Sequence, residues 1–381
     1  MKEAKAIVEA WTEARWSGQE AILATVVKVE GSAYRRPGAR LLLLQDGGRV
    51  GSVSGGCLED EVARKAWWLT REGRPSLVRY DTRGEEEGER PFGLGCEGVV
   101  HVLLERLRPG EPVSQLTLIE ACQHHRRPGV LATVIASTDG ARARVGDRVM
   151  LGPDGTVSGE LADAALTRAI ARDAATCLAR GRSEEHTYGA ASVLVEVFFE
   201  VVRPPKSLLV FGAGNDAMPV VRFAKELGWH VTVADGRAHY ARRERFPLAD
   251  EVVVIYPRSP LGHVSVPAGA GCVVMTHSAD QDRALLRALA TLPLAYLGVL
   301  GPRRRTERLL AEIEPATFAC STGLHSPVGL DLGGETPEEI ALAIIAEAQA
   351  SMADCDGRRL RDRADGRIHA PSAQAAYGAT P

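Results

Sequence analysis

Hydrophobic positions recur at helical spacing over residues 1–17 and then in dense runs, and these two patterns predict the first elements of the chain. The first helix buries one face, formed by Ile7, Val8, Trp11 and Ala14. Residues 57–70 predict a second helix, and the Gly- and Glu-rich residues 82–95 predict a loop. Apolar runs bounded by turn residues predict strands over 21–31, 39–48, 50–54, 76–81 and 98–107.

Parts of residues 1–203 occur twice. ILATVV (22–27) matches VLATVI (130–135), and Arg-x-Gly-x-Arg at 36–40 returns at 144–148 with the same offset. Val53-Ser54-Gly55 appears again as Val157-Ser158-Gly159 at a slightly shorter offset, with Glu160 in place of the next glycine and no counterpart of Cys57. VHVLLERLRP (100–109) likewise resembles VEVFFEVVRP (195–204). This predicts an N-terminal α+β domain over 1–203 with a degenerate internal repeat, its halves covering about 1–110 and 111–203.

A second domain is predicted after Pro204-Pro205-Lys206, because two prolines end the preceding strand. Strand 208–211, helix 216–227 and strand 230–234 form a βαβ unit. Further apolar runs at 251–255, 271–275 and 295–298 alternate with helices over 280–291, 302–313 and 337–352. The pattern indicates an α/β, Rossmann-like parallel sheet domain over 206–352, followed by a disordered tail over 353–381.

The βαβ unit carries a dinucleotide-binding pattern. Gly212-x-Gly214-x-x-Ala217 follows a strand and opens a helix, and Asp235 ends the next strand. In this pattern the glycines let the backbone approach a pyrophosphate, and the acidic residue receives a ribose diol. The sequence predicts a nucleotide-type ligand such as NAD(P); the alternative is a Rossmann fold whose ligand has changed or been lost.

Two further features follow strands of this domain, where α/β sheets collect ligands. His277 follows the apolar run VVMT, and Arg303 and Arg304 follow Gly301-Pro302. Guanidinium groups suit phosphate. The alternative for the arginines is a solvated first helical turn.

The first domain contains a glycine turn before its second helix. Ser54-Gly55-Gly56-Cys57 precedes a first turn that holds three carboxylates, at 59–61. The free N–H groups of a helix start favour an anion, and a thiolate there favours a soft metal centre. The alternative is a tight strand-to-helix turn with an inert buried cysteine.

A basic loop lies between the first two predicted strands. Tyr34, Arg35 and Arg36 come before Pro37, and pairing of the strands would bring the two guanidinium groups near the glycine turn. The alternative is an exposed basic hairpin.

Composition excludes several classes of protein. The 381 residues are 45% hydrophobic and 25% charged with a net charge of −3, which argues against a general nucleic-acid binder. No apolar run approaches the length of a membrane span. Seven scattered cysteines without a C-x-x-C pair argue against zinc ribbons and a disulfide framework, and fit a reducing cytoplasm.

These motifs together resemble the XdhC/CoxI family, the accessory proteins of xanthine dehydrogenase and related molybdenum hydroxylases. The resemblance covers nearly all of residues 5–350. Two positions depart from the family pattern: Pro302 stands where a serine is usual, and Ser278 where an aspartate is frequent. The matching stretches include EGSAYRRPGARLLLLQDGGRVGSVSGGCLEDEV (30–62), GLGCEGVVHVLLERL (93–107), LVFGAGNDA (209–217), THSADQDRALL (276–286), YLGVLGPRRR (296–305) and STGLHSPVGLDLGGETPEEIALAIIAE (321–347).

The resemblance implies a chaperone and not a turnover enzyme. Such a protein binds molybdenum cofactor (molybdopterin), protects it while its terminal sulfur is installed, and delivers it to a xanthine dehydrogenase-type hydroxylase, with a cysteine desulfurase as second partner. Cys57 is the expected metal ligand. The expected cofactor-binding residues are Tyr34, Arg35, Arg36, Ser54, Gly55, Gly56, Cys57 and Cys96 in the first domain, and Gly212, Gly214, Ala217, Asp235, His277, Arg303 and Arg304 in the second.

Two other functions stay open at this point. The Rossmann pattern allows an NAD(P)-dependent oxidoreductase, and Cys57 allows a persulfide carrier. A homodimer is the default expectation for the assembly.

Overall fold

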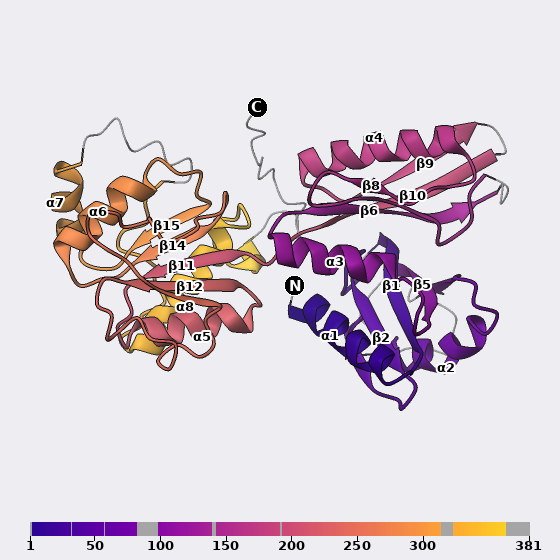
Figure 1. Cartoon of the computed structure of the whole chain (residues 1–381), viewed down its shortest axis with the longest axis horizontal. Helices are drawn as coiled ribbons and strands as arrows, with labels where there is room; N and C mark the ends of the chain where they lie inside the picture. Colours follow the sequence, from indigo (N-terminus) through magenta and orange to yellow (C-terminus); the bar gives the residue numbers. More distant parts are fainter. Residues whose placement is uncertain are drawn as a thin grey trace. The chain divides into compact units, whose positions relative to one another are not determined.

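The computed structural model divides at the Pro204-Pro205 junction into two compact units, residues 1–204 and 205–381 (Figure 1). Cys57, Cys96 and the predicted loop over 82–95 lie outside the residues that it describes. Every helix among the described residues is too short or too polar to cross a bilayer. The structure describes residues 2–31, 33–56, 58–81, 98–138, 142–190, 193–313 and 323–362.

The first unit contains two antiparallel five-stranded sheets of equivalent topology. Their strand orders are β3-β2-β1-β5-β4 and β8-β7-β6-β10-β9. One helix precedes each sheet (α1, α3), and another connects its third and fourth strands (α2, α4). The elements of the first half are α1 (Lys2–Trp16), β1 (Ala21–Gly31), β2 (Arg40–Leu44), β3 (Arg49–Gly51), α2 (Glu59–Leu69), β4 (Ser76–Asp81) and β5 (Gly98–Leu107). Those of the second are α3 (Ser114–His125), β6 (Gly129–Ser137), β7 (Arg148–Leu151), β8 (Val157–Ser158), α4 (Ala164–Arg180), β9 (Glu184–Ala190) and β10 (Val193–Val202).

The two halves pack against each other through equivalent residues. The pairing of β1 with β5 skips Val27, and the pairing of β6 with β10 skips Ile135, so both sheets bulge at the same place. These two side chains form one buried cluster with Leu103 and Phe198, which lie on β5 and β10. The cluster joins the sheets because each half contributes the same two positions to it.

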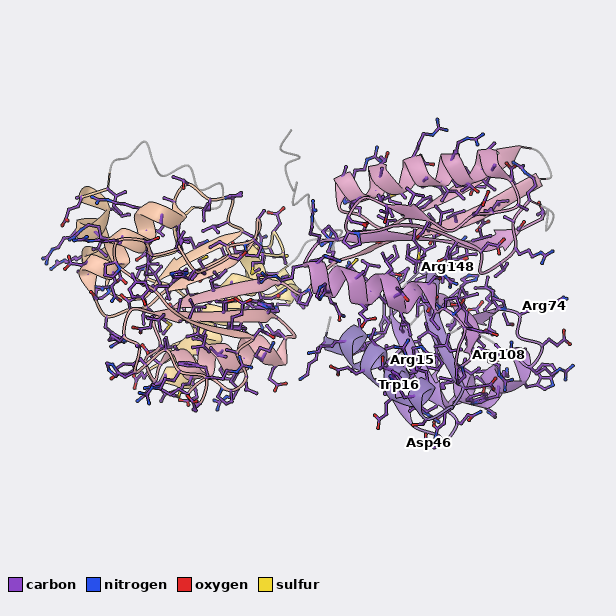
Figure 2. All side chains as sticks on the ribbon, in the orientation of Figure 1. Arg15, Trp16, Asp46, Arg74, Arg108 and Arg148 are labelled. Carbon is purple, nitrogen blue, oxygen red and sulfur yellow. The ribbon has the colours of Figure 1, made fainter. Side chains whose placement is uncertain are left out.

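Two buried ion pairs also join the halves. Arg40 of β2 donates to Glu200 of β10 (Nη1–Oε1 2.8 Å), and Arg148 of β7 donates to Glu105 of β5 (Nη2–Oε2 2.6 Å; Arg148 is labelled in Figure 2). Each arginine therefore pairs with the equivalent glutamate of the other half. This exchange is what an approximate two-fold relation between the halves requires.

The second unit is a parallel α/β layer structure. Its sheet has the order β13-β12-β11-β14-β15, and all neighbouring strands are parallel. Leu208 and Val210 of β11 share a core with α5 and α8, while Leu209 and Phe211 share a core with α6 and α7, so helices cover both faces (Figure 1). The elements are β11 (Ser207–Phe211), α5 (Ala217–Glu226), β12 (His230–Asp235), β13 (Glu251–Val254), β14 (Gly271–Val274), α6 (Ala279–Leu289), β15 (Tyr296–Val299), α7 (Arg303–Ala311) and α8 (Pro337–Ser351).

The fold class predicted from the sequence, an α+β domain with an internal repeat followed by a Rossmann-like parallel sheet, is confirmed. The part of the predicted tail that the structure describes, 353–362, forms turns and a short 3₁₀ helix (Leu360–Asp362). The strand predicted over 50–54 is wrong beyond Gly51, since the backbone N–H groups of Val53 and Ser54 donate to a side chain and not to a neighbouring strand.

One detail of the predicted repeat is also wrong. The register pairs Leu42 with Val50 in the first sheet and Met150 with Ser158 in the second, so the offset that relates Arg40 to Arg148 continues unchanged into β8. Gly159 is therefore the equivalent of Gly51 and not of Gly55. The short motif Val-Ser-Gly occurs in both halves without marking equivalent positions.

Candidate functional site

The basic loop and the glycine turn lie side by side in the first unit. Because β2 pairs antiparallel with both β1 and β3, residues 33–39 and residues 52–56 emerge at the same end of the sheet. A Cβ added to Gly55 would lie 3.6 Å from the ring of Tyr34, so this ring lies beside the exposed glycine. Arg35 donates from Nε to the carbonyl of Ser52 (3.2 Å) and pairs with Glu3 of α1. These contacts tie the loop to the turn.

The N–H groups of this turn donate hydrogen bonds to a glutamate side chain of the same unit. Glu59, the first residue of α2, is 7% exposed, and its Oε1 accepts from the N–H groups of Val53 (3.1 Å) and Ser54 (2.8 Å). Its Oε2 accepts from the N–H of Gly56 (3.1 Å) and from the Ser54 hydroxyl, while the Ser52 hydroxyl donates to Oε1 (2.7 Å). An internal carboxylate thus satisfies the N–H groups of the connection that leads into α2.

This arrangement sets the charge of Glu59. Burial opposes ionisation, but the hydrogen bonds from Ser54 and Ser52 outweigh it and lower the pKa of Glu59 to about 2. The carboxylate is therefore a fixed anion at neutral pH. A phosphate placed on the same N–H groups would have to displace it, so these donors hold the turn in shape.

The other predicted residues of this region are placed as follows. Arg36, Gly55 and Gly56 are exposed, and Tyr34 is 66% exposed, whereas Ser54 is buried beneath the turn. Cys57 and Cys96 fall outside the described residues. Sequence reasoning missed Glu59 as an organiser of the turn, because the N–H groups that donate to it lie back along the connection at Val53, Ser54 and Gly56 and do not form a capping box.

In the second unit the glycine pattern forms the turn between β11 and α5. Gly212 has φ of +122°, and a Cβ there would lie 2.3 Å from the carbonyl oxygen of Met275, so glycine is required. Ala217 is fully buried as the first residue of α5. A Cβ on Gly214 would lie 2.2 Å from Oδ1 of Asp216, so a carboxylate covers the glycine where a pyrophosphate would approach.

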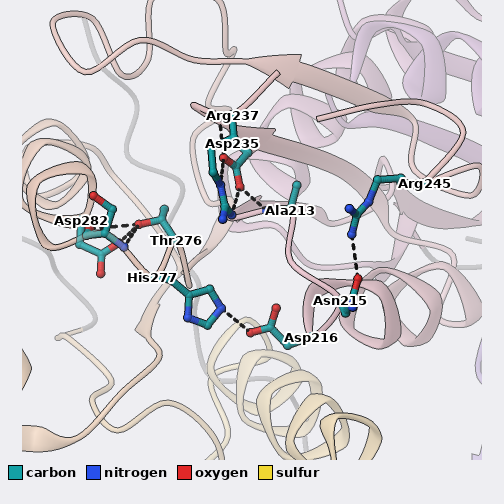
Figure 3. Close-up of polar contacts among 10 residues, drawn as sticks. Ala213, Asn215, Asp216, Asp235, Arg237, Arg245, Thr276, His277 and Asp282 are labelled. Carbon is teal, nitrogen blue, oxygen red and sulfur yellow. Dashed lines mark hydrogen bonds and ion pairs between the residues drawn. The ribbon is translucent and has the colours of Figure 1, made fainter. Parts of the chain in front are cut away.

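Asp235 lies at the end of β12, as predicted, but its carboxylate is fully buried and engaged (Figure 3). Oδ2 accepts from the N–H of Ala213 (2.7 Å) and from Nη2 of Arg237 (2.7 Å), and Oδ1 accepts from Nε of Arg237 (3.0 Å). Burial opposes ionisation, but the Arg237 guanidinium and the Ala213 N–H lower the pKa of Asp235. A ribose diol would have to displace Arg237 from both oxygens.

A cationic and aromatic stack stands beside the glycine turn. The guanidinium groups of Arg237 and Arg245 lie 4.1 and 4.6 Å from the ring centroid of Tyr240, and Arg245 also donates to Oδ1 of Asn215 (2.9 Å). The imidazole of His277 lies 3.2 Å from Asp216 (Nε2–Oδ2, Figure 3). His277 has φ of +57°, an uncommon conformation outside glycine that turns its side chain toward the glycine loop.

The arginines after β15 separate into two groups. Arg303 and Arg304 are exposed in the first turn of α7, in agreement with a solvated helix start. Arg305, which sequence reasoning did not single out, pairs instead with the fully buried Asp282 (Nη2–Oδ2 2.6 Å), which also accepts from Thr276. A run of three arginines gave no signal of which side chain turns inward.

Comparisons with known proteins match both units. Residues 14–81 and 122–189 match the family model described as the XdhC and CoxI family, and residues 208–348 match the XdhC Rossmann domain. The two matched segments of the first unit begin at positions 14 and 122, which is the same offset that relates Leu42 to Met150 in its two sheets.

Individual relatives cover most of the chain. It is 33% identical over 329 residues to a protein of Bacillus subtilis described as a probable subunit of xanthine dehydrogenase, and the match covers 86% of this chain and 92% of the relative. It is 22% identical over 339 residues to the molybdenum cofactor insertion chaperone PaoD of Escherichia coli, and this match covers 88% of this chain and 84% of that relative. The crystal structure of a protein described as a xanthine dehydrogenase from Bacillus halodurans aligns with a TM-score of 0.70 at 27% identity, over 95% of this chain and 99% of that one.

Proposed function

Because this chain belongs to the XdhC and CoxI family, we propose that it binds molybdenum cofactor as cargo, protects it while its terminal sulfur is installed, and delivers it to a xanthine dehydrogenase-type molybdenum hydroxylase. The names of two relatives, one a molybdenum cofactor insertion chaperone and the other a part of xanthine dehydrogenase, support this role. A cysteine desulfurase is the partner that supplies the sulfur. The chain acts in this scheme as a carrier and not as a turnover enzyme.

One observation carries the proposal: Gly55 is exposed beside the basic loop and packing does not require it. At Gly51 a Cβ would lie 2.3 Å from the carbonyl oxygen of Arg40, so that glycine is structural. At Gly55 a Cβ would meet the Tyr34 ring at 3.6 Å, an ordinary contact. A glycine without a packing reason leaves open surface where a bulky ligand can approach the backbone.

The residues around this turn have the chemistry that the cargo needs. Molybdopterin carries an anionic phosphate and a metal held by sulfur, so it calls for cationic donors and a soft ligand. Arg36 and the Tyr34 hydroxyl are the proposed contacts for the anionic and polar groups. Cys57 and Cys96 are the proposed thiol ligands, with Cys57 next to the metal.

The contacts of the second unit weigh against the alternative function, an NAD(P)-dependent oxidoreductase. Asp235, the residue expected to receive the ribose diol, is buried under Arg237, and Asp216 covers Gly214. The residues of the second unit proposed to contact an anionic ligand are those of the glycine turn, His277 and the exposed Arg303 and Arg304. The persulfide carrier predicts the gain of one sulfur atom on Cys57 after incubation with a desulfurase and cysteine, which mass spectrometry detects.

The proposal is tested on full-length protein purified without oxygen from cells that make the cofactor. Bound pterin is measured as the fluorescence of its oxidised form, and molybdenum by elemental analysis. Arg36→Ala and Cys57→Ala should each lower both several-fold. The matched controls are Arg172→Ala on the exposed side of α4 and Cys355→Ala at an exposed cysteine, which should keep parental cofactor content.

Gly55→Ala separates binding from folding. It should leave the unfolding midpoint unchanged, since the added methyl group makes an ordinary contact with the Tyr34 ring. It should lower the bound pterin, because it fills exposed surface between Tyr34 and the turn where the ligand is proposed to bind. Parental pterin and molybdenum content in the Gly55, Arg36 and Cys57 variants would show that the cofactor binds elsewhere or not at all.

A further inference from the structure

Metal-ligating side chains from α4 and β9 face one another in the second half of the first unit. Asp173 and Cys177 are one helical turn apart and share a face of α4. Glu184 and His186 are two residues apart on β9 and share a face of that strand, with the odd-numbered neighbours exposed. A spacing of four residues in the helix and of two residues in the strand thus brings thiol, carboxylate and imidazole groups together.

The distances between these groups are short. One ligand atom each of Cys177, Glu184 and His186 lies within 4.8 Å of the other two. His186 contacts Glu184 through Nε2 (3.1 Å to Oε2) and faces Asp173 through Nδ1 (3.5 Å to Oδ2). Asp173 also accepts from the hydroxyl of Tyr188 (2.5 Å). The cluster therefore has an inner and an outer layer of polar groups, as ligated metal sites have.

The ligand-type side chains beside Cys177 distinguish it from Cys122. Both cysteines are completely buried and belong to apolar cores, and burial raises the pKa of both thiols to about 11. Beside Cys177, however, lie the carboxylates of Glu184 and Asp173 together with the imidazole of His186. Two carboxylates beside one thiol, with Arg180 as the nearby cation (3.6 Å to Glu184), form an acidic cluster whose charge a divalent cation would neutralise.

We propose that Cys177, Glu184 and His186 bind a zinc-type divalent cation, with water as the fourth ligand and Asp173 orienting His186 from the outer layer. Thiolate, imidazole and carboxylate are the ligands that zinc takes in proteins, and three protein ligands with one open position are typical of it. Binding forms a metal–sulfur bond and releases the thiol proton to solvent. This site is independent of the cofactor-binding role proposed for Cys57.

The geometry is close to what such a cation needs. Bonds of about 2.0–2.3 Å at a tetrahedral centre place the donor atoms about 3.3–3.8 Å apart. The Glu184–His186 separation of 3.1 Å is already short enough, and the longest separation, at most 4.8 Å, would have to shorten by about 1 Å. Rotation of the Glu184 and His186 side chains can supply this movement, because they are 27% and 30% exposed.

The test uses the full-length chain stripped of metal with a chelator and titrated with Co²⁺, a spectroscopic substitute for Zn²⁺. One equivalent should bind with a sulfur-to-cobalt charge-transfer band in the near ultraviolet, and Zn²⁺ should displace it. Cys177→Ser should remove the band. Glu184→Gln and His186→Gln should each weaken binding at least tenfold.

Two controls keep the test decisive. Cys122→Ser and Cys57→Ala should bind Co²⁺ like the parent, which separates this site from the proposed cofactor site. If Cys177→Ser does not fold, the Glu184 and His186 variants decide, because their side chains are partly exposed. Absence of stoichiometric binding, or parental affinity in both of those variants, would overturn the proposal.

Discussion

Glu59→Gln is the sharpest test of how the glycine turn is built. The substitution keeps the size of the side chain but removes its charge. In either orientation its amide NH₂ faces a donor, either the N–H groups of Val53 and Ser54 or the N–H group of Gly56. A buried donor that faces another donor loses its hydrogen bond. We therefore expect a substantial loss of stability in the first unit.

The magnitude follows from the pKa of Glu59. Folding lowers it from the ordinary 4.5 to about 2, and because each unit corresponds to about 1.4 kcal/mol, the ionised form contributes up to about 3 kcal/mol. A lowered carboxyl pKa gives stability that is fully present above about pH 5 and is lost as the pH falls toward 2. The difference in unfolding free energy between parent and Glu59→Gln should thus be about 3 kcal/mol at pH 7 and should shrink toward pH 2.

Urea unfolding followed by tryptophan fluorescence between pH 7 and pH 2.5 measures this difference. The signal reports mainly on the first unit, which holds four of the five tryptophans, Trp11, Trp16, Trp67 and Trp68. Asp60→Asn is the matched control, since Asp60 is the next residue and forms an exposed ion pair with Arg49, so its loss should cost less than about 1 kcal/mol. If Glu59→Gln were as stable as Asp60→Asn, or kept the parental pH dependence, the Glu59 carboxylate would not hold the turn.

Three further substitutions test the packing of each unit by urea unfolding. Arg40→Met leaves Glu200 charged and mostly buried, and should cost about 3–5 kcal/mol. Gly212→Ala puts a methyl group against the Met275 carbonyl at a positive φ, and should cost the second unit more than about 2 kcal/mol. Thr336→Ala removes the hydroxyl that caps α8, and should cost about 1 kcal/mol. Parental stability of the Arg40 or Gly212 variant would contradict the contacts described for it.

The elements that sequence predicted best are those with a strong local pattern. Strands 21–31, 76–81 and 98–107 begin and end where they were predicted, because each is an apolar run bounded by turn residues. The βαβ unit was equally accessible, since Gly212 is required by a backbone conformation that leaves a mark in the sequence.

The features of the candidate sites that could not be predicted from the sequence depend on contacts between side chains in the folded structure. Asp235 matches the ribose position of a dinucleotide site by spacing, but the structure shows its charge already matched by Arg237, two residues later. In the same way, the sequence shows Glu59 only as one of three acidic residues in the first turn of a helix. In the structure its carboxylate accepts the hydrogen bonds of the preceding glycine turn. A motif fixes where a residue lies, whereas its partners determine whether it is available to a ligand.

The two halves of the first unit show where function separates from fold. Gly51 and Gly159 occupy equivalent positions. A Cβ would lie 2.3 Å from the carbonyl oxygen of Arg40 in the first case and of Arg148 in the second, so both halves need glycine there. From this glycine to the helix, the first half uses seven residues, 52–58, and the second uses four, 160–163. In the second half Asp163 caps α4 directly through the N–H groups of two residues in its first turn. The longer connection is not needed to start a helix, and it is the one that carries exposed glycines beside a basic loop. That extra length supports the proposal that the ligand of this unit binds in the first half.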